Sequence, residues 1–452
     1  MIIRKSVIKI AIPIMIEQAF ILFLGICNTI MAGHIGEEAV SAVGMVDTIN
    51  NMFIAIFSAI AVGATVVIAQ EIGQNKSKEV ISSTASEALI SGIIVSIILV
   101  IIMWIFKSSI IESFYGSASE EVKKYSNSYF NFTLISYPFI AAQQTASGIL
   151  RGSGNTKIPM YVTGFMNVIN VILGYLFIYG IDINIFGNYI KFNSLGIEGA
   201  ALAIGISRFI GAILIIGVLL RGCDKIKINS LLKIKFSLDM EKKIYGIGIP
   251  AGIEQFIFNA GKIIVQIFVV TMGTVSITAN TIGFSVCTIP NVIGNALALA
   301  GTTLVGQSVG RGDFKGAKGI LIYLTKFGTV FMFAMGMIMV PISPWLASLY
   351  TDNIEVINLS ALIIRMCCFA LLFWPISFIM SSGLKGAGDT TYTMITAFVG
   401  MWIFRILFGY ILGVYFKMGI VGMWIGMFVD WLVRGIMYCY RLKGTKWLKH
   451  KI

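Results

Sequence analysis

Charged residues are scarce in this sequence. Asp, Glu, Lys and Arg together make up 12% of its 452 residues, and hydrophobic residues make up 57%, whereas about 25% charge is usual in soluble domains. So few charges cannot cover a water-facing surface, which excludes an ordinary soluble protein. The Gly-x-x-x-x-Gly-Lys spacing of a nucleotide-binding loop is also missing, so we expect no direct use of ATP and no enzyme activity.

Cysteine chemistry is not indicated either. The six cysteines lie mostly within apolar stretches and have neither metal-ligand spacing nor a plausible extracellular pairing. The first apolar run is long enough to span a membrane and is not followed by a small-residue cleavage site. We therefore expect that run to remain as a helix, and we expect no cofactor.

What the sequence does have is long apolar runs from end to end. A ~30 Å hydrocarbon core requires about 20 residues of helix, and twelve stretches reach that length. They predict an all-α polytopic membrane protein with twelve transmembrane helices. The predicted spans are 8–32, 40–71, 84–106, 125–148, 158–180, 195–220, 244–271, 275–308, 317–341, 356–383, 392–415 and 418–440.

The basic residues indicate how the chain is oriented. Of 34 Lys and Arg, 23 fall on the side of the amino terminus, five on the opposite side and six within spans. This bias predicts a multi-pass protein of the cell membrane with both termini cytoplasmic. The net charge of +13 is thereby explained as a topology signal, and we expect no nucleic-acid partner, because no RNA- or DNA-binding motif accompanies it.

The chain contains an internal repeat at an offset of about 237 residues. LRGSGNT at 150–156 also matches LKGAGDT at 384–390. Six spans per half return the chain to its starting side, so the halves are parallel repeats. We predict a first six-helix bundle at 1–220, a basic cytoplasmic linker at 221–243 and a second bundle at 244–452. Matched pairs at the offset of 237 are Pro13/Pro250, Glu17/Glu254, Gln18/Gln255, Gly36/Gly273, Thr65/Thr302, Gln70/Gln307, Gly73/Gly310 and Lys78/Lys315.

Several phrases resemble one transporter family. They are NTIMAGHIG (28–36), RGSGNTKIPM (151–160), TLVGQSVGRGDFKGAK (303–318) and KGAGDTTYTM (385–394). Their order and spacing resemble the multidrug and toxic compound extrusion (MATE) transporters over nearly the whole chain. The resemblance implies two six-helix bundles around a central cavity, and export of organic, often cationic, compounds driven by an inward proton or sodium gradient.

Acidic side chains within the spans are the first candidates for ion coupling. An ionised group at mid-bilayer costs ~3 kcal/mol or more, so such residues face protein or water. Four acids lie well inside the predicted spans: Glu17, Asp47, Glu254 and Asp430. We predict an ion-coupling or cargo cavity that includes Glu254, Gln255, Glu17, Gln18, Asn28, Asp47, Asn51, Asn170, Lys262, Asn291 and Asn295.

A carboxyl group in such a cavity can couple two fluxes. Removal from water favours its protonated form, whereas an incoming organic cation favours its ionised form, so proton and cargo compete. Sodium could replace the proton, with a possible site at Glu254. The sequence leaves both ions open. It also leaves open that Glu17 and Glu254 only bond neighbouring helices, and that Lys262 snorkels rather than enters the cavity. Asp430 and Arg434, four residues apart, are predicted to form a structural ion pair.

One position departs from the family pattern. Many members of the family carry an aspartate, implicated in ion coupling, where this chain has Asn28. An amide cannot titrate, which favours Glu254 as the coupling group. Asn170 and Arg405 align with each other in the two halves and match polar positions of the family pattern.

Two functions other than export are also open to a polytopic membrane protein. A flippase for lipid-linked saccharides, from the wider superfamily, would favour several cationic residues for a pyrophosphate, and we expect no such clustering of the in-span cations within the repeat. A channel or sensor is the third reading, but no selectivity loop is visible. We expect small organic molecules and membrane lipids as partners, and a monomer. The six in-span cations are Arg208, Lys262, Lys326, Arg365, Arg405 and Arg434.

Overall fold

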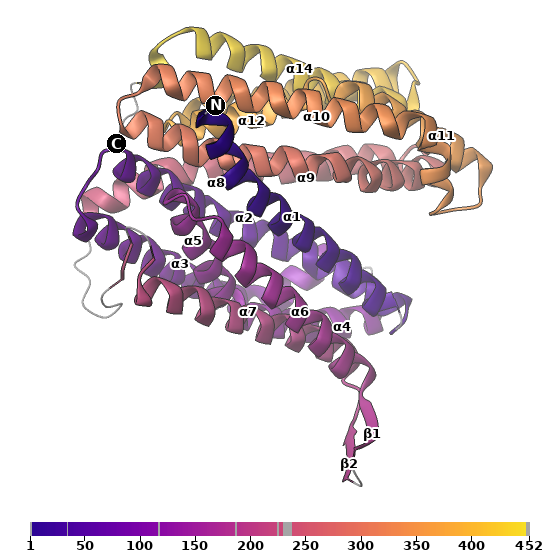
Figure 1. Ribbon diagram of the computed structural model, residues 1–452. Helices are drawn as coiled ribbons and strands as arrows, with labels where there is room; N and C mark the ends of the chain where they lie inside the picture. Colours follow the sequence, from indigo (N-terminus) through magenta and orange to yellow (C-terminus); the bar gives the residue numbers. More distant parts are fainter. Residues whose placement is uncertain are drawn as a thin grey trace. The chain divides into compact units, whose positions relative to one another are not determined.

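The computed structural model describes residues 2–33, 35–115, 118–185, 188–223, 226–228 and 237–448. The predicted linker at 221–243 therefore lies partly outside the described residues. Within them, the chain is almost entirely helical (Figure 1).

In the described part of the chain, ten helices are long and apolar enough to cross a membrane singly. An eleventh span is a pair, α11 (Ile354–Ala370) and α12 (Trp374–Gly386), bent by 52° at its break. The predicted fourth span is covered by α4 (Glu120–Ile135) and α5 (Tyr137–Gly152). Helix thus occupies each of the twelve predicted spans, which confirms the fold class. The single spans are α1 (Ile2–Gly33), α2 (Glu37–Gly73), α3 (Lys78–Tyr115), α6 (Lys157–Tyr179), α7 (Gly196–Arg221), α8 (Leu238–Val270), α9 (Thr274–Gly310), α10 (Phe314–Ser348), α13 (Thr390–Phe398) with η1 (Val399–Phe408) and η2 (Ile411–Tyr415), and α14 (Gly419–Lys443).

Both broken spans restart at a proline. Pro138 and Pro375 are the second residues of α5 and α12, within the first turn, where the missing N–H costs no helical hydrogen bond. A different distortion occurs in η1 and η2, which are π-helical. Such segments are rare and frequently mark functional sites, and η1 carries Arg405.

A β-hairpin follows α6 and is not part of the sequence prediction. Its strands, β1 (Ile181–Ile185) and β2 (Asn188–Phe192), pair antiparallel with Ile183 opposite Ile190. The segment IDINI alternates isoleucine with polar residues, the pattern of a strand. In Figure 1 the hairpin extends beyond the end of α6.

The chain divides into two compact units. Unit 1 comprises 1–15, 65–76 and 246–452, and unit 2 comprises 16–64 and 77–245. In unit 1, α9 and α10 run side by side (Figure 1), and the core is formed around Trp374, Leu297 and Trp431. In unit 2, Tyr129, Phe130 and Tyr137 are fully or almost fully buried. The predicted boundaries at 220 and 244 describe the sequence repeat and stay a prediction.

The repeat is visible as a reciprocal contact within unit 1, where the ends of α2 and α9 cross. A Cβ atom on Gly73 would lie 2.2 Å from the carbonyl oxygen of Gln307, and one on Gly310 would lie 2.2 Å from the carbonyl oxygen of Gln70. Glycine at both positions permits this close backbone approach. The four residues are two matched pairs of the repeat, so the halves use the same residues for the same crossing.

Candidate functional site

Glu254 forms a buried ion pair in unit 1. It lies on α8, one turn after Pro250, and is 4% exposed. Its Oε1 accepts a hydrogen bond from Lys385 Nζ at 2.8 Å, in the last turn of α12. Its Oε2 lies 3.0 Å from the hydroxyl of Thr393 on α13, which shares its proton with the carbonyl oxygen of Thr390 at 2.9 Å. Both carboxylate oxygens therefore have a donor.

Glu17 forms the matching pair in unit 2. It lies on α1, one turn after Pro13, and is 1% exposed. Its Oε1 accepts from Arg151 Nη2 at 2.6 Å and from the Thr163 hydroxyl at 3.3 Å. Its Oε2 has no hydrogen-bond partner among the described residues. The same three chemical groups, a carboxylate, a base and a threonine, thus recur in both halves.

These two pairs show how the predicted acids of α1 and α8 are held in the structure. Each carboxylate is sealed among helices and bound to a basic side chain of its own unit, because a buried charge is tolerable only with a partner. The bases, Arg151 and Lys385, were missed by the site prediction. Their signal was present, since they open the matched phrases RGSGNT and KGAGDT. Gln18 is half-buried and Gln255 is exposed.

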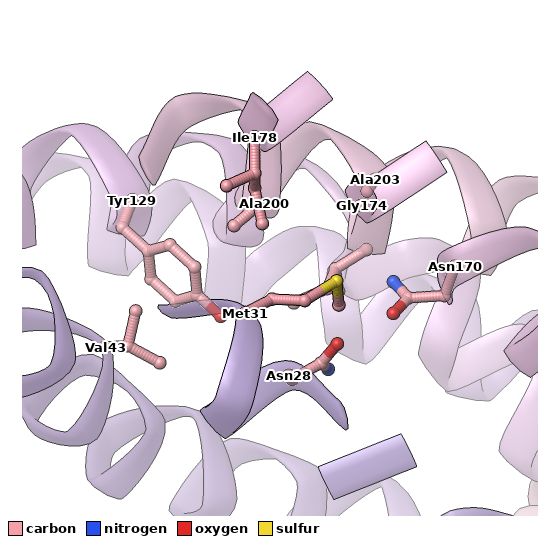
Figure 2. Close-up of a pocket in the computed structure, with 10 residues that line it drawn as sticks. Asn28, Met31, Val43, Tyr129, Asn170, Gly174, Ile178, Ala200 and Ala203 are labelled. Atoms are coloured by element: carbon pink, nitrogen blue, oxygen red, sulfur yellow. The ribbon is translucent and has the colours of Figure 1, made fainter. Parts of the chain in front are cut away.

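Asn28 and Asn170, both predicted site residues, meet at a small cavity in unit 2. Figure 2 shows their amide groups directed toward the same space, with Tyr129 at the other end of the cavity. Asn170 donates to the Ser207 hydroxyl at 3.4 Å, and its Oδ1 has no partner among the described residues. The volume is about 20 Å³, which is room for about one water molecule. A drug-sized molecule does not fit there in this conformation.

Asp47 belongs to a separate polar network in unit 2. It accepts from Asn50 Nδ2 at 3.2 Å, and Asn50 Oδ1 accepts from the Tyr137 hydroxyl at 2.6 Å. Arg208 donates to the Ser136 hydroxyl at 2.7 Å, at the break between α4 and α5, and its charge interacts with Asp47. This network holds α2, α5 and α7 together.

The remaining predicted residues lie on exposed polar faces. On α8, Gln255 and Lys262 are joined by Asn259 and Gln266, which sequence reasoning missed, at spacings of four, three and four residues. This places four polar side chains along one stripe.

Asn51 on α2 and Asn295 on α9 are exposed, and Asn291 is half-buried. Asn291 Oδ1 has no partner among the described residues. Polar groups on a spanning helix are costly in contact with lipid, which favours water beside these faces.

Asp430 lies at the centre of a buried cluster in unit 1. Arg434 binds it through two contacts, Nε to Oδ1 at 2.6 Å and Nη2 to Oδ2 at 3.2 Å. This confirms the ion pair predicted from the four-residue spacing. Arg405 joins from η1, with Nη2 3.0 Å from Oδ2. Asp430 is 0% exposed and Arg434 1%.

Comparison with known proteins decides the family. The MatE family model matches residues 13–176 and 250–411, which are corresponding stretches of the two halves. The chain belongs to the MatE family. The resemblance seen in the sequence motifs is therefore confirmed.

Relatives of this MatE protein match it along its whole length. A protein named probable multidrug resistance protein NorM from Thermotoga maritima is 28% identical over 450 residues, covering 100% of this chain and 94% of the relative. An uncharacterized transporter, YisQ from Bacillus subtilis, is 26% identical over 98% of this chain and 95% of its own length.

Solved structures show the same fold as this MatE chain. An outward-facing multidrug resistance MATE family transporter has a TM-score of 0.89 at 22% identity, covering 98% of this chain and 96% of that chain. A MOP superfamily transporter from Pyrococcus furiosus has a TM-score of 0.88 at 21% identity, covering 98% and 95%. The multi-pass helical architecture is therefore that of MATE transporters.

Proposed function

We propose that this protein is a secondary active exporter of small organic molecules in the cell membrane, with both termini cytoplasmic. It works by alternating access and is driven by an inward proton or sodium gradient. Family membership and the multidrug resistance relatives support export of drugs or metabolites. The buried Glu254–Lys385 pair supports the coupling step and is the observation that carries the proposal.

In this proposal the ammonium group of Lys385 binds the carboxylate of Glu254 whenever neither a proton nor cargo is bound there. Proton uptake by Glu254 removes the negative charge that holds the ammonium group, so the pair opens. The pair links α8 to the end of α12, and its opening frees α8 one turn after Pro250, whose missing N–H already leaves the preceding turn without one backbone hydrogen bond. Loss of the proton restores the pair. A proton gradient can thereby bias one conformation over the other.

The geometry favours a proton over sodium as the coupling ion. A proton needs one carboxylate oxygen, whereas sodium needs several oxygen ligands at once. At Glu254 one oxygen is taken by Lys385, and the groups of the described residues within hydrogen-bond distance of the carboxylate are an ammonium and a hydroxyl. A sodium ion would have to displace the ammonium and recruit further oxygens.

One observation supports the alternative function, a flippase for lipid-linked saccharides. Contrary to the expectation from the sequence, three of the six in-span cations lie in one neighbourhood of unit 1: Lys262, Arg405 and Arg434. A saccharide pyrophosphate is an anion, and such a group would suit this charge.

The test is transport by purified protein in liposomes. The lumen is loaded with rhodamine 123, a cationic dye, and either a pH gradient or a sodium gradient is imposed. We expect dye movement with the pH gradient, abolished by nigericin in the presence of potassium, and little movement with sodium alone. If neither gradient changes the movement of the dye, the proposed export function is refuted. Translocation of a lipid-linked pyrophosphate without a gradient would favour the flippase.

A further inference from the structure

The Asp430 cluster carries more positive than negative charge. Arg434 and Arg405 both bind the carboxylate of Asp430. Lys262, on α8, lies close enough to Arg405 for their charges to repel. With all four side chains ionised, three positive charges face one negative charge, an excess of two.

Packing fixes Lys262 beside the π-helical segment. A Cβ atom on Gly261 would lie 2.4 Å from Met401 Cε, so α8 and η1 are in direct contact at the residue before Lys262. Met401 lies about one turn before Arg405 on η1. The neighbouring Phe258 of α8 lies under the Arg434 guanidinium, at 4.8 Å from ring centroid to Cζ. The three cations are therefore held on facing elements of one unit.

The cations of the cluster differ in the number of partners that bind their charged groups. Arg434 has two contacts to Asp430 and aromatic rings on its faces, from Phe258 and from Phe378 at 4.6 Å. Arg405 shares one oxygen of Asp430, its side chain is 8% exposed, and its Nε has no partner among the described residues. Uncompensated charge at this depth is expensive, and a guanidinium cannot lose its proton.

Lys262 belongs to the polar stripe of α8 and not to its lipid-facing side. Gln255, Asn259 and Gln266 share its stripe, whereas Phe256, Ile263 and Ile267 are exposed apolar residues on another face. Successive residues of a helix are rotated by about 100°, which separates Lys262 from Ile263 by that angle. In the described part of the chain, Lys262 has no ion-pair or hydrogen-bond partner.

We propose that Lys262 and Arg405 bind an anionic group of the transported molecule, a carboxylate, sulfonate or phosphate. The inference rests on the proposed exporter function and names the chemistry of its cargo. Lys262, exposed on the polar stripe, makes the first contact, and Arg405 supplies a second donor at greater depth. The cargo class is then anionic or zwitterionic organic molecules, not cations alone.

Equilibrium binding to the purified full-length protein in phosphatidylcholine nanodiscs tests this site. Fluorescein, an anion, and rhodamine 123, a cation, share one ring system and are measured by fluorescence anisotropy. We expect Lys262→Gln to raise the Kd for fluorescein about 10- to 100-fold, as for loss of a charged hydrogen bond, and not to weaken rhodamine 123 binding. Lys326→Gln, an exposed lysine of α10, is the matched control and leaves both constants unchanged. Equal Kd values for fluorescein in the Lys262→Gln variant and the natural protein would overturn the inference, as would failure of the natural protein to bind fluorescein.

A second arm separates cargo from lipid. Native mass spectrometry measures retained phosphatidylglycerol in the same variants. A Lys262→Gln variant that loses bound phosphatidylglycerol and binds fluorescein normally would assign the lysine to a lipid headgroup and overturn the proposal.

Failure of the site is distinguishable from failure of the exporter. One outcome is that a gradient drives rhodamine 123 export by the natural protein while Lys262→Gln leaves fluorescein binding unchanged. That result would refute the anion site and support the export function. Fluorescein binding that depends on Lys262, without transport of either dye, would support the anion site and refute the export function.

Discussion

The two halves of the chain hold the same kind of ion pair with different chemistry. In the second half, Glu254 has a donor for each carboxylate oxygen and its base is Lys385. In the first half, one oxygen of Glu17 has no partner among the described residues, and its base is Arg151. A lysine binds a carboxylate as a single point charge, whereas the planar guanidinium of an arginine can bind it through two parallel donors. Under the proposed function the Glu254 pair opens and closes, whereas the Glu17 pair keeps α1 attached to α5.

Other aligned positions of the two halves also differ in charge. The aligned positions Asn170 and Arg405 are an amide in the first half and a cation in the second. Asn28 and Asn170 line a cavity of about 20 Å³ in unit 2 with neutral groups. Arg405 is one of three clustered cations in unit 1, with Lys262 and Arg434. The aligned positions 170 and 405 therefore carry an amide beside a neutral cavity in the first half and a cation in a charged cluster in the second.

Removing either base gives the largest expected effect on stability. Lys385→Met and Arg151→Met each leave a buried carboxylate without its base, which costs about 3–5 kcal/mol. We expect the greater loss for Arg151→Met, because Glu17 then keeps only the 3.3 Å contact to Thr163. Thermal unfolding in detergent, followed by tryptophan fluorescence, measures both. Adding Glu254→Gln or Glu17→Gln to the respective variant should recover most of the loss, and single variants as stable as the natural protein would show that the pairs contribute nothing.

Exchanging the bases sharpens the comparison. Lys385→Arg keeps the charge but can bind the carboxylate of Glu254 through two parallel donors, which opposes opening of the pair, so we expect gradient-driven export to fall about tenfold, which corresponds to 1.4 kcal/mol. Arg151→Lys should lower export less than about threefold, because its pair stays closed. Initial rates of rhodamine 123 transport in liposomes measure the two variants side by side. Equal losses of export rate in the two variants would mean that both ion pairs contribute equally to coupling.

The threonines give the smallest expected effect. Thr393→Val removes the donor to Glu254 Oε2 at 3.0 Å, and we expect a loss of about 1 kcal/mol in unfolding free energy. Thr163→Val removes a longer contact of 3.3 Å, and we expect about half that loss. Thermal unfolding again measures both. A larger loss of unfolding free energy for Thr163→Val would contradict the expectation that the shorter contact, to Glu254, is the stronger one.

The spans and the repeat could be predicted from the sequence because each depends on local or duplicated patterns. A run of about 20 apolar residues defines a span wherever it packs. Asp430 and Arg434 are four residues apart on one helix, so their contact is also local. Asn28 and Asn170 were predicted to belong to one site, and the structure places both on one cavity.

The partners of the acids could not be predicted in the same way. Arg151 is 134 residues from Glu17, and Lys385 is 131 residues from Glu254. Helical periodicity tells which face a residue is on, but not which other helix that face meets. The same reason hid the contact of Arg405 with Asp430.

Gradient-driven transport by Glu254→Gln beside Glu17→Gln tests the central claim most directly. Each change keeps the shape of the side chain and removes its titration. With a pH gradient across liposomes, we expect Glu254→Gln to abolish uphill rhodamine 123 export while Glu17→Gln retains at least about a third of it, a loss of under 1 kcal/mol in the barrier. Full uphill export by Glu254→Gln would contradict the account.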